Sequence, residues 1–340
     1  MRASQIKISI VFPTFNGENV IFHNLLSIKN LNNLIEIEVI IVDNNSTDST
    51  KSIINSFKKD INITLINQNT NLGFARACNI AVSKAKGEYI YITNQDVAFP
   101  KDFFSILLKL YKKLKKDHEI IISPAVIFPG RFINYYGAKV HFLGFSYTPL
   151  MYQKIPKQIT TFRTKKASGC SIFMKRKLFL DLNGFDPNFF MYHEDTDFSL
   201  KAIRNGIQIY TTNESMLYHQ KIHMSINDFS YYYIERNRYL VLCKNIKNLR
   251  NLIPYIILSE FILIFQAVIT RKIKLRLKIY KFLILNNKLI RYLRYNKNNN
   301  KYDKIEMNFL ESNLDSIILG KILSKVKILR IFLKILNSIF

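Results

Sequence analysis

The feature that most constrains the fold is a strict alternation of short apolar runs and helix-like patterns over the first 116 residues. Buried-type strands are predicted at 7–15, 35–43, 62–68 and 88–93, and segments with helical spacing follow them at 18–31, 46–59, 74–87 and 100–116. Strands that alternate with helices are joined by right-handed crossovers, which make the strands parallel and cover both sheet faces. The sequence therefore predicts an α/β fold with a Rossmann-like, mostly parallel central sheet.

Two familiar nucleotide-binding motifs are missing from this layout. No G-x-G-x-x-G run follows the first predicted strand, and the sequence contains no G-x-x-x-x-G-K-[ST] loop. This disfavours a dehydrogenase and a P-loop nucleotide hydrolase. Residues 125–165 look irregular and aromatic, which is typical of loops over a site, and strands are expected again near 167–176 and 207–212. Gly87 is expected to close the helix that begins near residue 74.

The cysteines and the N-terminus bear on the compartment. Cys78, Cys170 and Cys243 lie far apart and form no C-x-x-C pair, which argues against a disulfide framework and against a zinc site. The first 17 residues are interrupted by polar residues and proline, so they are interpreted as a first strand and not as a signal peptide. The cysteine pattern favours a reducing compartment.

The charge of the chain is strongly positive. Fifty Lys and Arg oppose 24 Asp and Glu, which gives a net charge of +26. Nucleic acid, an anionic membrane surface and phosphorylated small molecules all attract such a surface. The distribution is more informative, because residues 246–340 hold 19 Lys and Arg against 5 Asp and Glu.

The last part of the chain differs in character from the rest. Residues 251–270 are almost entirely apolar and near membrane-spanning length, although Pro254, Glu260 and Gln266 interrupt them. Residues 271–295 and 316–340 resemble basic amphipathic helices that lie in a membrane interface. An ordinary helical extension remains the alternative. We therefore predict an α/β domain over 1–245 and a basic amphipathic helical extension with membrane association over 246–340.

Polar side chains follow each of the first four predicted strands. In a doubly wound sheet, ligands bind outside the carboxyl ends of the strands. The residues expected there are Pro13, Thr14, Phe15 and Asn16 after the first strand, Asp43 after the second, Asn71 and Gly73 after the third, and Asn94, Gln95 and Asp96 after the fourth. One aspartate at a strand end is commonly a helix cap, but the repetition favours a binding site.

A second acidic cluster lies at Glu194, Asp195 and Asp197, directly after an aromatic and apolar run. These acids open a predicted helix over 194–206, with Gly206 at its C-terminal end, and acidic first turns are common because they meet the free N–H groups of a helix. Like charges this close also raise each other's pKa. On the local pattern alone, a structural role and a catalytic role both stay open.

Taken in order, several stretches resemble one known family. They are "VFPTFNG", "VDNNSTD", "NLGFARACN", "TNQDV", "ASGCSIFMKRKLFLDLNGFDPNFFMYHEDTDFSLKAIRNG" and "YYYIERNRYLVLCKN". The chain is similar to family 2 glycosyltransferases with the GT-A fold, and within them to the rhamnosyltransferase-like branch. The resemblance covers roughly residues 7–245 and does not extend to the tail.

The resemblance implies an inverting, metal-dependent enzyme that moves a hexosyl or rhamnosyl group from a nucleotide-sugar to a hydroxyl. It implies that Asp43 meets the N3–H of a pyrimidine base and that Thr14 and Phe15 line the same pocket. Asp96 would bind Mg²⁺ or Mn²⁺, and Asp195 would be the general base.

The resemblance also assigns supporting roles. Glu194 would raise the pKa of Asp195, and His219 would complete the metal or diphosphate site. Arg76 and Arg236 are the candidate diphosphate contacts. The family's D-x-D motif departs here to Asn94-Gln95-Asp96, which is common in the rhamnosyltransferase-like branch.

The resulting expectation is an enzyme at the cytoplasmic face of the membrane, or in the cytoplasm, that extends a lipid-linked cell-surface polysaccharide. The donor would be dTDP-rhamnose or a UDP-hexose, and no nucleic-acid partner is expected. Two alternatives stay open: a basic nucleic-acid-binding protein, and a catalytically silent membrane scaffold with a transferase fold. The three aspartates argue against the second alternative, and the core-like spacing of the aromatic residues argues against the first.

Overall fold

The structure is a computed structural model that describes residues 7–32, 35–220, 227–247 and 249–295. The chain divides into two compact units. The first unit contains residues 1–138 and 150–223, and the second contains residues 139–149 and 224–340. The predicted site residues up to 219 all belong to the first unit.

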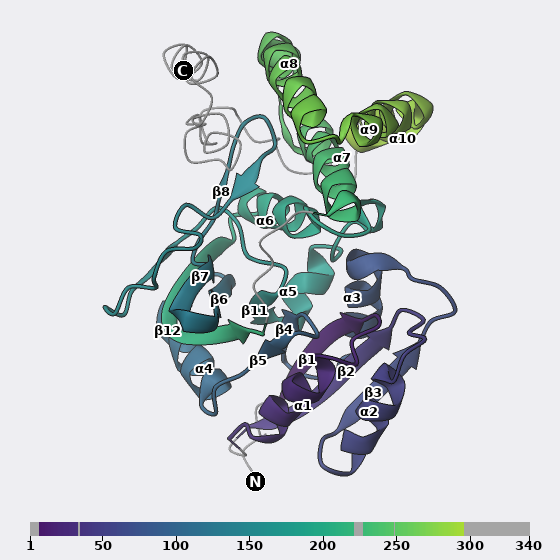
Figure 1. Ribbon diagram of the computed structural model, residues 1–340. Coiled ribbons are helices and arrows are strands. Elements are labelled where there is room, and N and C mark those ends of the chain that lie inside the picture. The colour runs from purple at the N-terminus through teal and green to yellow at the C-terminus, as the bar shows by residue number, and fades with distance from the viewer. Residues whose placement is uncertain (1–6, 33–34, 221–226, 248, 296–340) are drawn as a thin grey trace. The chain divides into compact units, whose positions relative to one another are not determined.

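The first unit contains the predicted alternation of strands and helices (Figure 1). Its elements are β1 (Lys7–Thr14), α1 (Ile21–Lys29), β2 (Glu36–Asp43), α2 (Thr50–Ser56), β3 (Ile63–Asn67), α3 (Gly73–Lys84), β4 (Tyr89–Thr93), β5 (Val97–Ala98), α4 (Phe103–Leu114), β6 (Ile120–Phe128), β7 (Phe132–Tyr135), β10 (Thr161–Arg163), β11 (Ser171–Lys175), α5 (Arg176–Asp181), α6 (Glu194–Arg204) and β12 (Gln208–His219).

Within the described residues these strands form one ten-stranded sheet, in the order β10-β12-β6-β11-β4-β1-β2-β3, with β5 on β12 and β7 on β6. The strands β3, β2, β1 and β4 run parallel, as do β6 and β12. Strand β11 is inserted antiparallel between β4 and β6. The predicted α/β fold with a mostly parallel sheet is confirmed.

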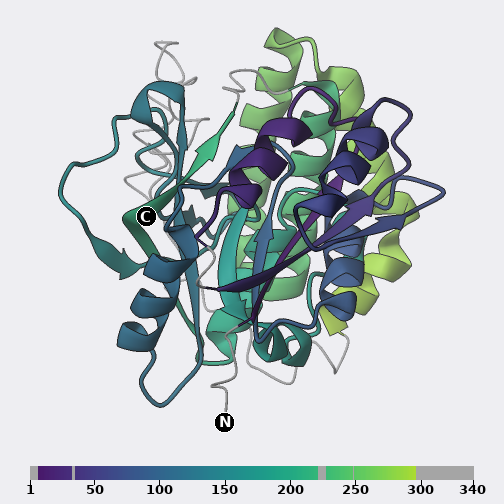
Figure 2. The ribbon, with the colours of Figure 1, turned by 90° about the horizontal axis from the view of Figure 1, so that it is seen from below.

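Both faces of the sheet are covered by helices (Figures 1 and 2). In β1, the side chains of Ile8, Ile10 and Phe12 belong to the core under α1, α2 and α4. Val11 points to the opposite core, under α3, α5 and α6. A strand that is buried on both faces needs apolar residues at successive positions, which explains the unbroken apolar runs in the sequence.

Two local predictions are wrong in detail. Residues 125–135 are not irregular, because β6 continues to Phe128 and pairs with β7. Gly87 does not close α3, which ends at Lys84. Its role is instead a close approach of two backbones: a Cβ at Gly87 would come within 2.7 Å of the Ser9 backbone nitrogen. Gly206 does end α6, with a φ of 75°.

The second unit is mainly helical. Its elements are β8 (Lys139–Val140), β9 (Ser146–Tyr147), α7 (Asp228–Asn245), α8 (Ile253–Ile269), α9 (Ile273–Leu285) and α10 (Asn287–Tyr295). The predicted domain boundary after residue 245 coincides with the end of α7 and stays a prediction. The amphipathic helix predicted over 316–340 lies outside the described residues.

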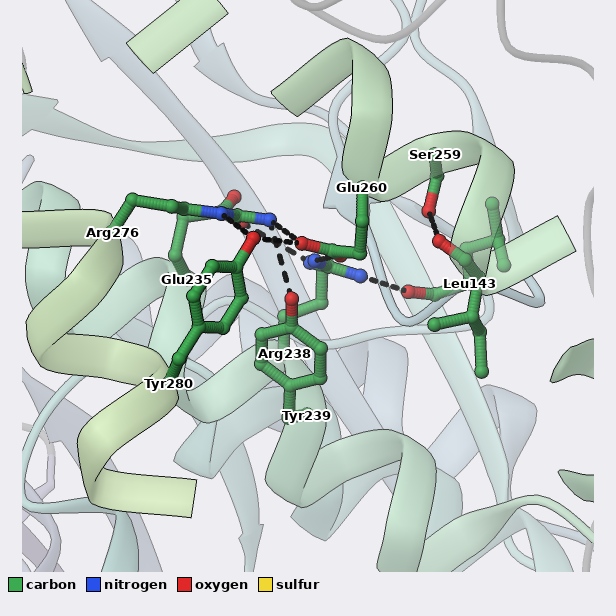
Figure 3. A network of polar contacts seen from close by, with 9 residues as sticks. Leu143, Glu235, Arg238, Tyr239, Ser259, Glu260, Arg276 and Tyr280 are labelled. Atoms are coloured by element: carbon green, nitrogen blue, oxygen red, sulfur yellow. Dashed lines mark hydrogen bonds and ion pairs between the residues drawn. The ribbon is translucent and has the colours of Figure 1, made fainter. Parts of the chain in front are cut away.

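A buried network of charges joins three helices of the second unit (Figure 3). Arg238 of α7 and Arg276 of α9 are fully buried. Arg238 pairs with Glu260 of α8 at 2.9 Å, and Arg276 binds both Glu260 and Glu235. Tyr280 donates to Glu260 at 2.7 Å. Buried charges are tolerated only when they are paired and hydrogen-bonded, so this network fixes how α7, α8 and α9 pack.

Candidate active site

The ends of β1, β2 and β4 meet at one edge of the sheet. The β1–β2 register places Thr14 opposite Asp43. The Thr14 hydroxyl donates to the Gln95 Oε1 atom just after β4, and the Phe15 N–H donates to the same oxygen at 3.2 Å. Gly17 lies so close that a Cβ there would meet Gln95 Oε1 at 2.3 Å. These contacts join the three strand ends into one surface, as the sequence predicted for parallel strands.

Asp43 is completely buried at the end of β2. Its Oδ2 atom accepts a hydrogen bond from the Ser46 N–H at 3.0 Å. Its Oδ1 atom has no hydrogen-bond partner among the described residues. Since buried polar atoms are nearly always hydrogen-bonded, a lone acceptor here fits a ligand that supplies an N–H group.

The loop that follows β1 is held against the loop that follows β2. Asn16 has a φ of 45°, and its N–H donates to the Ser46 hydroxyl at 3.0 Å. Its side-chain oxygen accepts from the Thr47 N–H at 2.9 Å. Asn16 and Phe15 are exposed, whereas Pro13 is half-buried. Phe15 therefore presents an aromatic ring to solvent beside the buried Asp43 carboxylate.

The loop that follows the third strand, β3, leads into the start of α3. The Gly73 N–H donates to the Asn71 side chain at 2.9 Å. Gly73 has a φ of 79°, and a Cβ there would come within 2.4 Å of the Phe190 carbonyl oxygen. Glycine is required because the loop before α6 approaches the backbone at this point. Arg76 is exposed on the same helix.

Asp96 and His219 lie side by side. Strand β5 follows Asp96 and pairs with β12, opposite His219. The Asp96 Oδ2 atom and the His219 Nε2 atom are 3.4 Å apart. Asn94 is half-buried, and its backbone carbonyl accepts a hydrogen bond from the Asn24 side-chain amide at 3.3 Å. Among the described residues no three His, Cys, Asp or Glu side chains form a metal-binding group.

This pair fits a divalent cation that also binds a substrate. Mg²⁺ sites in proteins commonly use one or two carboxylates and complete their coordination with substrate phosphates and water. Carboxylate and imidazole are also ligands suited to Mn²⁺-like ions. Asp96 and His219 could therefore supply two ligands of such a site, and the remaining ligands would come from a substrate and water.

The acidic cluster stands at the first turn of α6, after a constrained loop. Phe190, Tyr192 and His193 have φ values of 63°, 65° and 67°. Such conformations are unfavourable for residues other than glycine and persist only where the surroundings enforce them. They turn the chain sharply, so that Glu194 and Asp195 begin the helix as buried residues.

The Asp195 carboxyl group is contacted by the neighbouring segment 166–169 and by Thr196. The Lys166 ammonium lies 3.1 Å from its Oδ2 atom, and the Gly169 N–H donates to the same oxygen at 2.9 Å. The Thr196 hydroxyl donates to Oδ1 at 3.3 Å. The sequence did not point to Lys166, although it directly precedes the quoted stretch that begins at Ala167.

Glu194 carries the adjacent carboxyl group. Burial, together with the negative charge of Asp195, raises the pKa of Glu194 to about 8. Its Oε2 atom is buried without a hydrogen-bond partner among the described residues. The two adjacent carboxyl groups therefore differ in their surroundings: the raised pKa favours the protonated form of Glu194 at neutral pH, whereas Asp195 has the Lys166 ammonium as a partner.

Cys170 connects the acidic cluster with the strand ends. Its carbonyl accepts from the Thr93 hydroxyl at 2.8 Å, at the end of β4. Burial raises the pKa of the Cys170 thiol to about 12, and the negative charges of Asp96 and Asp195 add to this effect. The structure thus brings Asp43, Asp96 and Asp195 to one edge of the sheet.

Two other predicted residues have different surroundings. Asp197 is fully buried, and its charge counteracts the lowering of the Arg204 pKa by burial, which supports a structural role. Arg236 belongs to the second unit. Its guanidinium carbon lies 4.8 Å from the Tyr233 ring centre and 5.0 Å from that of Phe282.

The fold and the acidic edge define an α/β protein of the Rossmann-like type with its site at the carboxyl ends of the strands. The family model described as glycosyl transferase family 2 matches residues 9–182, just over half of the chain. The chain belongs to this family.

Several curated proteins are similar to parts of the chain. An uncharacterized glycosyltransferase of Mycoplasma genitalium is 28% identical over 62% of this chain and 68% of its own length. The abequosyltransferase RfbV of Salmonella typhimurium is 36% identical over 29% of this chain and 31% of its own length. A poly(ribitol-phosphate) beta-glucosyltransferase of Bacillus spizizenii is 42% identical over 27% of this chain and 15% of its own length. The chain spans 15 to 36% of the first four curated relatives it matches.

Solved structures show the same fold. GalNAc-T7, crystallised with UDP, GalNAc and Mn²⁺, aligns with a TM-score of 0.62 at 16% identity, over 86% of this chain and 58% of its own. Residues 1–349 of S. aureus TarS in complex with UDP-GlcNAc align with a TM-score of 0.50 at 19% identity, over 69% of this chain and 67% of that one.

Proposed function

We propose that the first unit transfers a sugar from a nucleotide-sugar to an acceptor hydroxyl, with inversion at the anomeric carbon. This proposal rests on the two adjacent carboxyl groups at the start of α6, Glu194 and Asp195, which have different surroundings. Lys166 and Gly169 orient the Asp195 carboxyl group, while burial and the neighbouring charge raise the pKa of Glu194 to about 8. A carboxylate that is held in a fixed orientation is suited to accepting a proton from an incoming hydroxyl.

In the proposed transfer, one bond to the anomeric carbon forms as another breaks. The acceptor oxygen forms a bond to the anomeric carbon from the face opposite the leaving group. Asp195 takes the proton of that hydroxyl, and the bond between the anomeric carbon and the nucleoside diphosphate breaks with its electron pair. A positioned base and an in-line approach together lower the barrier because the reacting atoms are already aligned.

The donor is proposed to carry a pyrimidine base. The buried Oδ1 atom of Asp43 can accept the N3–H of uracil or thymine, and the exposed ring of Phe15 can stack on the base. Thr14, Gln95 and Asn71 are proposed to line the same edge, with Pro13, Asn16, Gly73 and Asn94 shaping its loops and Arg76 near the diphosphate. dTDP-rhamnose and UDP-hexoses both fit this description.

A divalent metal is proposed to bind between Asp96 and His219. When bound, Mg²⁺ or Mn²⁺ would neutralise charge on the diphosphate as it leaves. The GT-A enzyme GalNAc-T7 was solved with UDP and Mn²⁺, which supports a metal of this kind. The residues of this chain orient the site, since Gln220 donates its N–H to the Asp96 carbonyl at 2.9 Å.

The acceptor is proposed to be a lipid-linked saccharide of a growing cell-surface polysaccharide. The relatives named for abequosyl transfer and for poly(ribitol-phosphate) glucosyl transfer support an acceptor of this broad type. We propose that the protein lies at the cytoplasmic face of the membrane as a peripheral protein, or in the cytoplasm. Leu249–Ile269 is the one helical segment of the described residues that is long and apolar enough to cross a membrane, and core helices of soluble proteins pass the same test.

Asp195→Asn tests the proposal directly. The substitution keeps the shape of the side chain and removes the base, so turnover of the cognate nucleotide-sugar should fall by about 10²–10⁴-fold. Donor binding, measured as a rise in melting temperature, should persist. Asp181→Asn on the exposed side of α5 is the matched control and should leave turnover unchanged. Turnover near the wild-type rate in Asp195→Asn would exclude Asp195 as the base.

A further inference from the structure

A cavity of about 640 Å³ lies within the second unit, between the end of α7, the start of α8 and α10. Its polar walls carry the cationic side chains of Lys247, Arg250, Arg291 and Arg294, and Ile253 and Ile256 line its apolar side. None of the described residues that line it is Asp or Glu. The cavity therefore combines a concentrated positive charge with an apolar wall.

One cation of this cavity is hydrogen-bonded to the backbone of α7, while two others face solvent. Arg294 donates from Nη1 to the carbonyls of Cys243 and Ile246 at the end of α7, which ties α10 to α7. Arg250 and Arg291 are exposed. Guanidinium groups are well suited to phosphate because their planar donors bind two oxygens at once.

An apolar surface continues from the cavity along α8. Ile253 lines the cavity and also begins a stripe with Ile257, Phe261, Phe265 and Val268 at helical spacing. Phe261 is 68% exposed. An exposed apolar stripe of this length on one helix marks an interaction surface, and the cations at its end indicate an amphiphile.

The buried network explains why this face of α8 is outward. Glu260 of the same helix is turned toward α7 and α9, where Arg238 and Arg276 bind it (Figure 3). A helix that crossed a bilayer on its own would carry this carboxylate into hydrocarbon, at a cost of about 2.5–3.5 kcal/mol or more. Packed on α7 and α9, the helix can instead lie along a membrane surface.

We propose that the cavity binds the phosphate headgroup of a membrane lipid, with the hydrocarbon chain lying along the apolar stripe of α8. Basic pockets beside apolar helices bind anionic headgroups in this way. The site rests on the proposed membrane-surface location and makes it specific, because it names the residues that contact the lipid. It requires no transferase activity.

Charge complementarity favours a lipid over a segment of the chain itself. Residues 321–340 carry five Lys and Arg and no Asp or Glu, so a cationic cavity repels them. Residues 303–315 carry four acids and are the competing occupant. A lipid supplies both the anion and a long apolar chain.

The test uses the full chain and vesicles of phosphatidylcholine, with or without phosphatidylglycerol. Arg250→Gln/Arg291→Gln should weaken binding to the anionic vesicles by about 10–30-fold, since each cation at such a surface contributes roughly three- to fivefold. Lys274→Gln/Lys281→Gln removes the same charge from exposed positions of α9 outside the cavity and should change binding by less than about threefold. Both pairs are exposed, so circular dichroism and melting should match the wild type.

Three results would overturn the proposal. Equal weakening by the two double variants would mean that general surface charge, and not the cavity, attracts the membrane. Unchanged vesicle binding in Arg250→Gln/Arg291→Gln would mean that the cavity does not hold the lipid headgroup and is available to residues 303–315. Protection of the melting temperature by inorganic phosphate without vesicles, in wild type but not in that variant, would identify a soluble phosphate ligand. Transfer to a soluble acceptor, measured in parallel, shows separately whether the proposed activity holds.

Discussion

At the scale of single residues, Glu194 and Asp195 are neighbours with the same functional group and opposite surroundings. The Asp195 carboxylate meets an ammonium and a backbone N–H, whereas the Glu194 carboxyl group meets buried space and a negative neighbour. Segment 166–169 lies near both groups, because a Cβ at Gly169 would come within 3.4 Å of Glu194 Oε1. The difference is that Lys166 pairs with Asp195 and that the Gly169 N–H donates to it.

The raised pKa of Glu194 predicts a pH dependence of stability. Its carboxyl has an ordinary pKa of 4.5 and a folded-state pKa of about 8, so the folded protein keeps a proton that the unfolded chain releases. The free energy of unfolding should fall as the pH rises from about 4.5 to 8, by at most about 1.4 kcal/mol per pH unit. Glu194→Gln should remove this slope in urea titrations. Exposed Glu214→Gln should retain it, and parallel curves for Glu194→Gln and wild type would contradict the assignment.

At the scale of helices and strands, the elements that matter most are placed by long-range contacts. Strand β11 runs antiparallel between β4 and β6, which delivers Gly169 and Cys170 to the parallel strand ends. In the second unit, Arg276 and Glu235 pair across 41 residues of sequence. Each contact fixes the position of a whole element, since a buried charge without its partner is strongly unfavourable.

The helix network predicts a large effect of one substitution on α7. Burial alone would raise the pKa of Glu235, but Arg238 and Arg276 outweigh it and lower that pKa. Glu235→Gln leaves both guanidinium groups partly uncompensated and should lower the stability of the second unit by about 3–5 kcal/mol. Asp228→Asn on the same helix removes only an exposed pair with Lys272 and should change stability by less than about 1 kcal/mol. Hydrogen exchange of α7–α9 measures both, and equal protection would show that the network contributes little.

At the scale of the whole molecule, ligand binding and folding of the first unit are linked. A ligand that binds only the folded state stabilises it, by about 2.7 kcal/mol at a concentration 100 times its dissociation constant. The proposed site needs the metal and the diphosphate together, because Asp96 and His219 supply only part of a coordination shell.

This linkage predicts a cooperative thermal shift. UDP or dTDP with Mn²⁺ should raise the melting temperature more than the sum of the separate effects, and EDTA should cancel the excess. Asp96→Ala should abolish the Mn²⁺-dependent part while keeping the fold, and exposed Asp181→Ala should behave as wild type. A nucleotide shift that is unchanged by Mn²⁺ and EDTA would exclude a metal at Asp96.

The sequence by itself determined the parallel half of the sheet and the position of the acids along it. Buried parallel strands are apolar at successive positions, and polar residues follow their ends. The local pattern alone therefore placed Asp43 and Asp96 at the ends of strands. The first turn of α6 was equally readable, because acids before a helical stripe are a local signal. The roles of these residues in transfer stay predictions.

Only the tertiary structure decided how the acids differ and what surrounds them. Lys166 reaches Asp195, and Gly73 lies under the Phe190 carbonyl, because separate segments fold against each other. The irregular prediction for residues 125–135 failed for the same reason: β6 is a strand because β11, β12 and β7 pair with it. Local propensity carries no information about which distant segment supplies a partner, whereas pairing, desolvation and buried charge depend on that partner entirely.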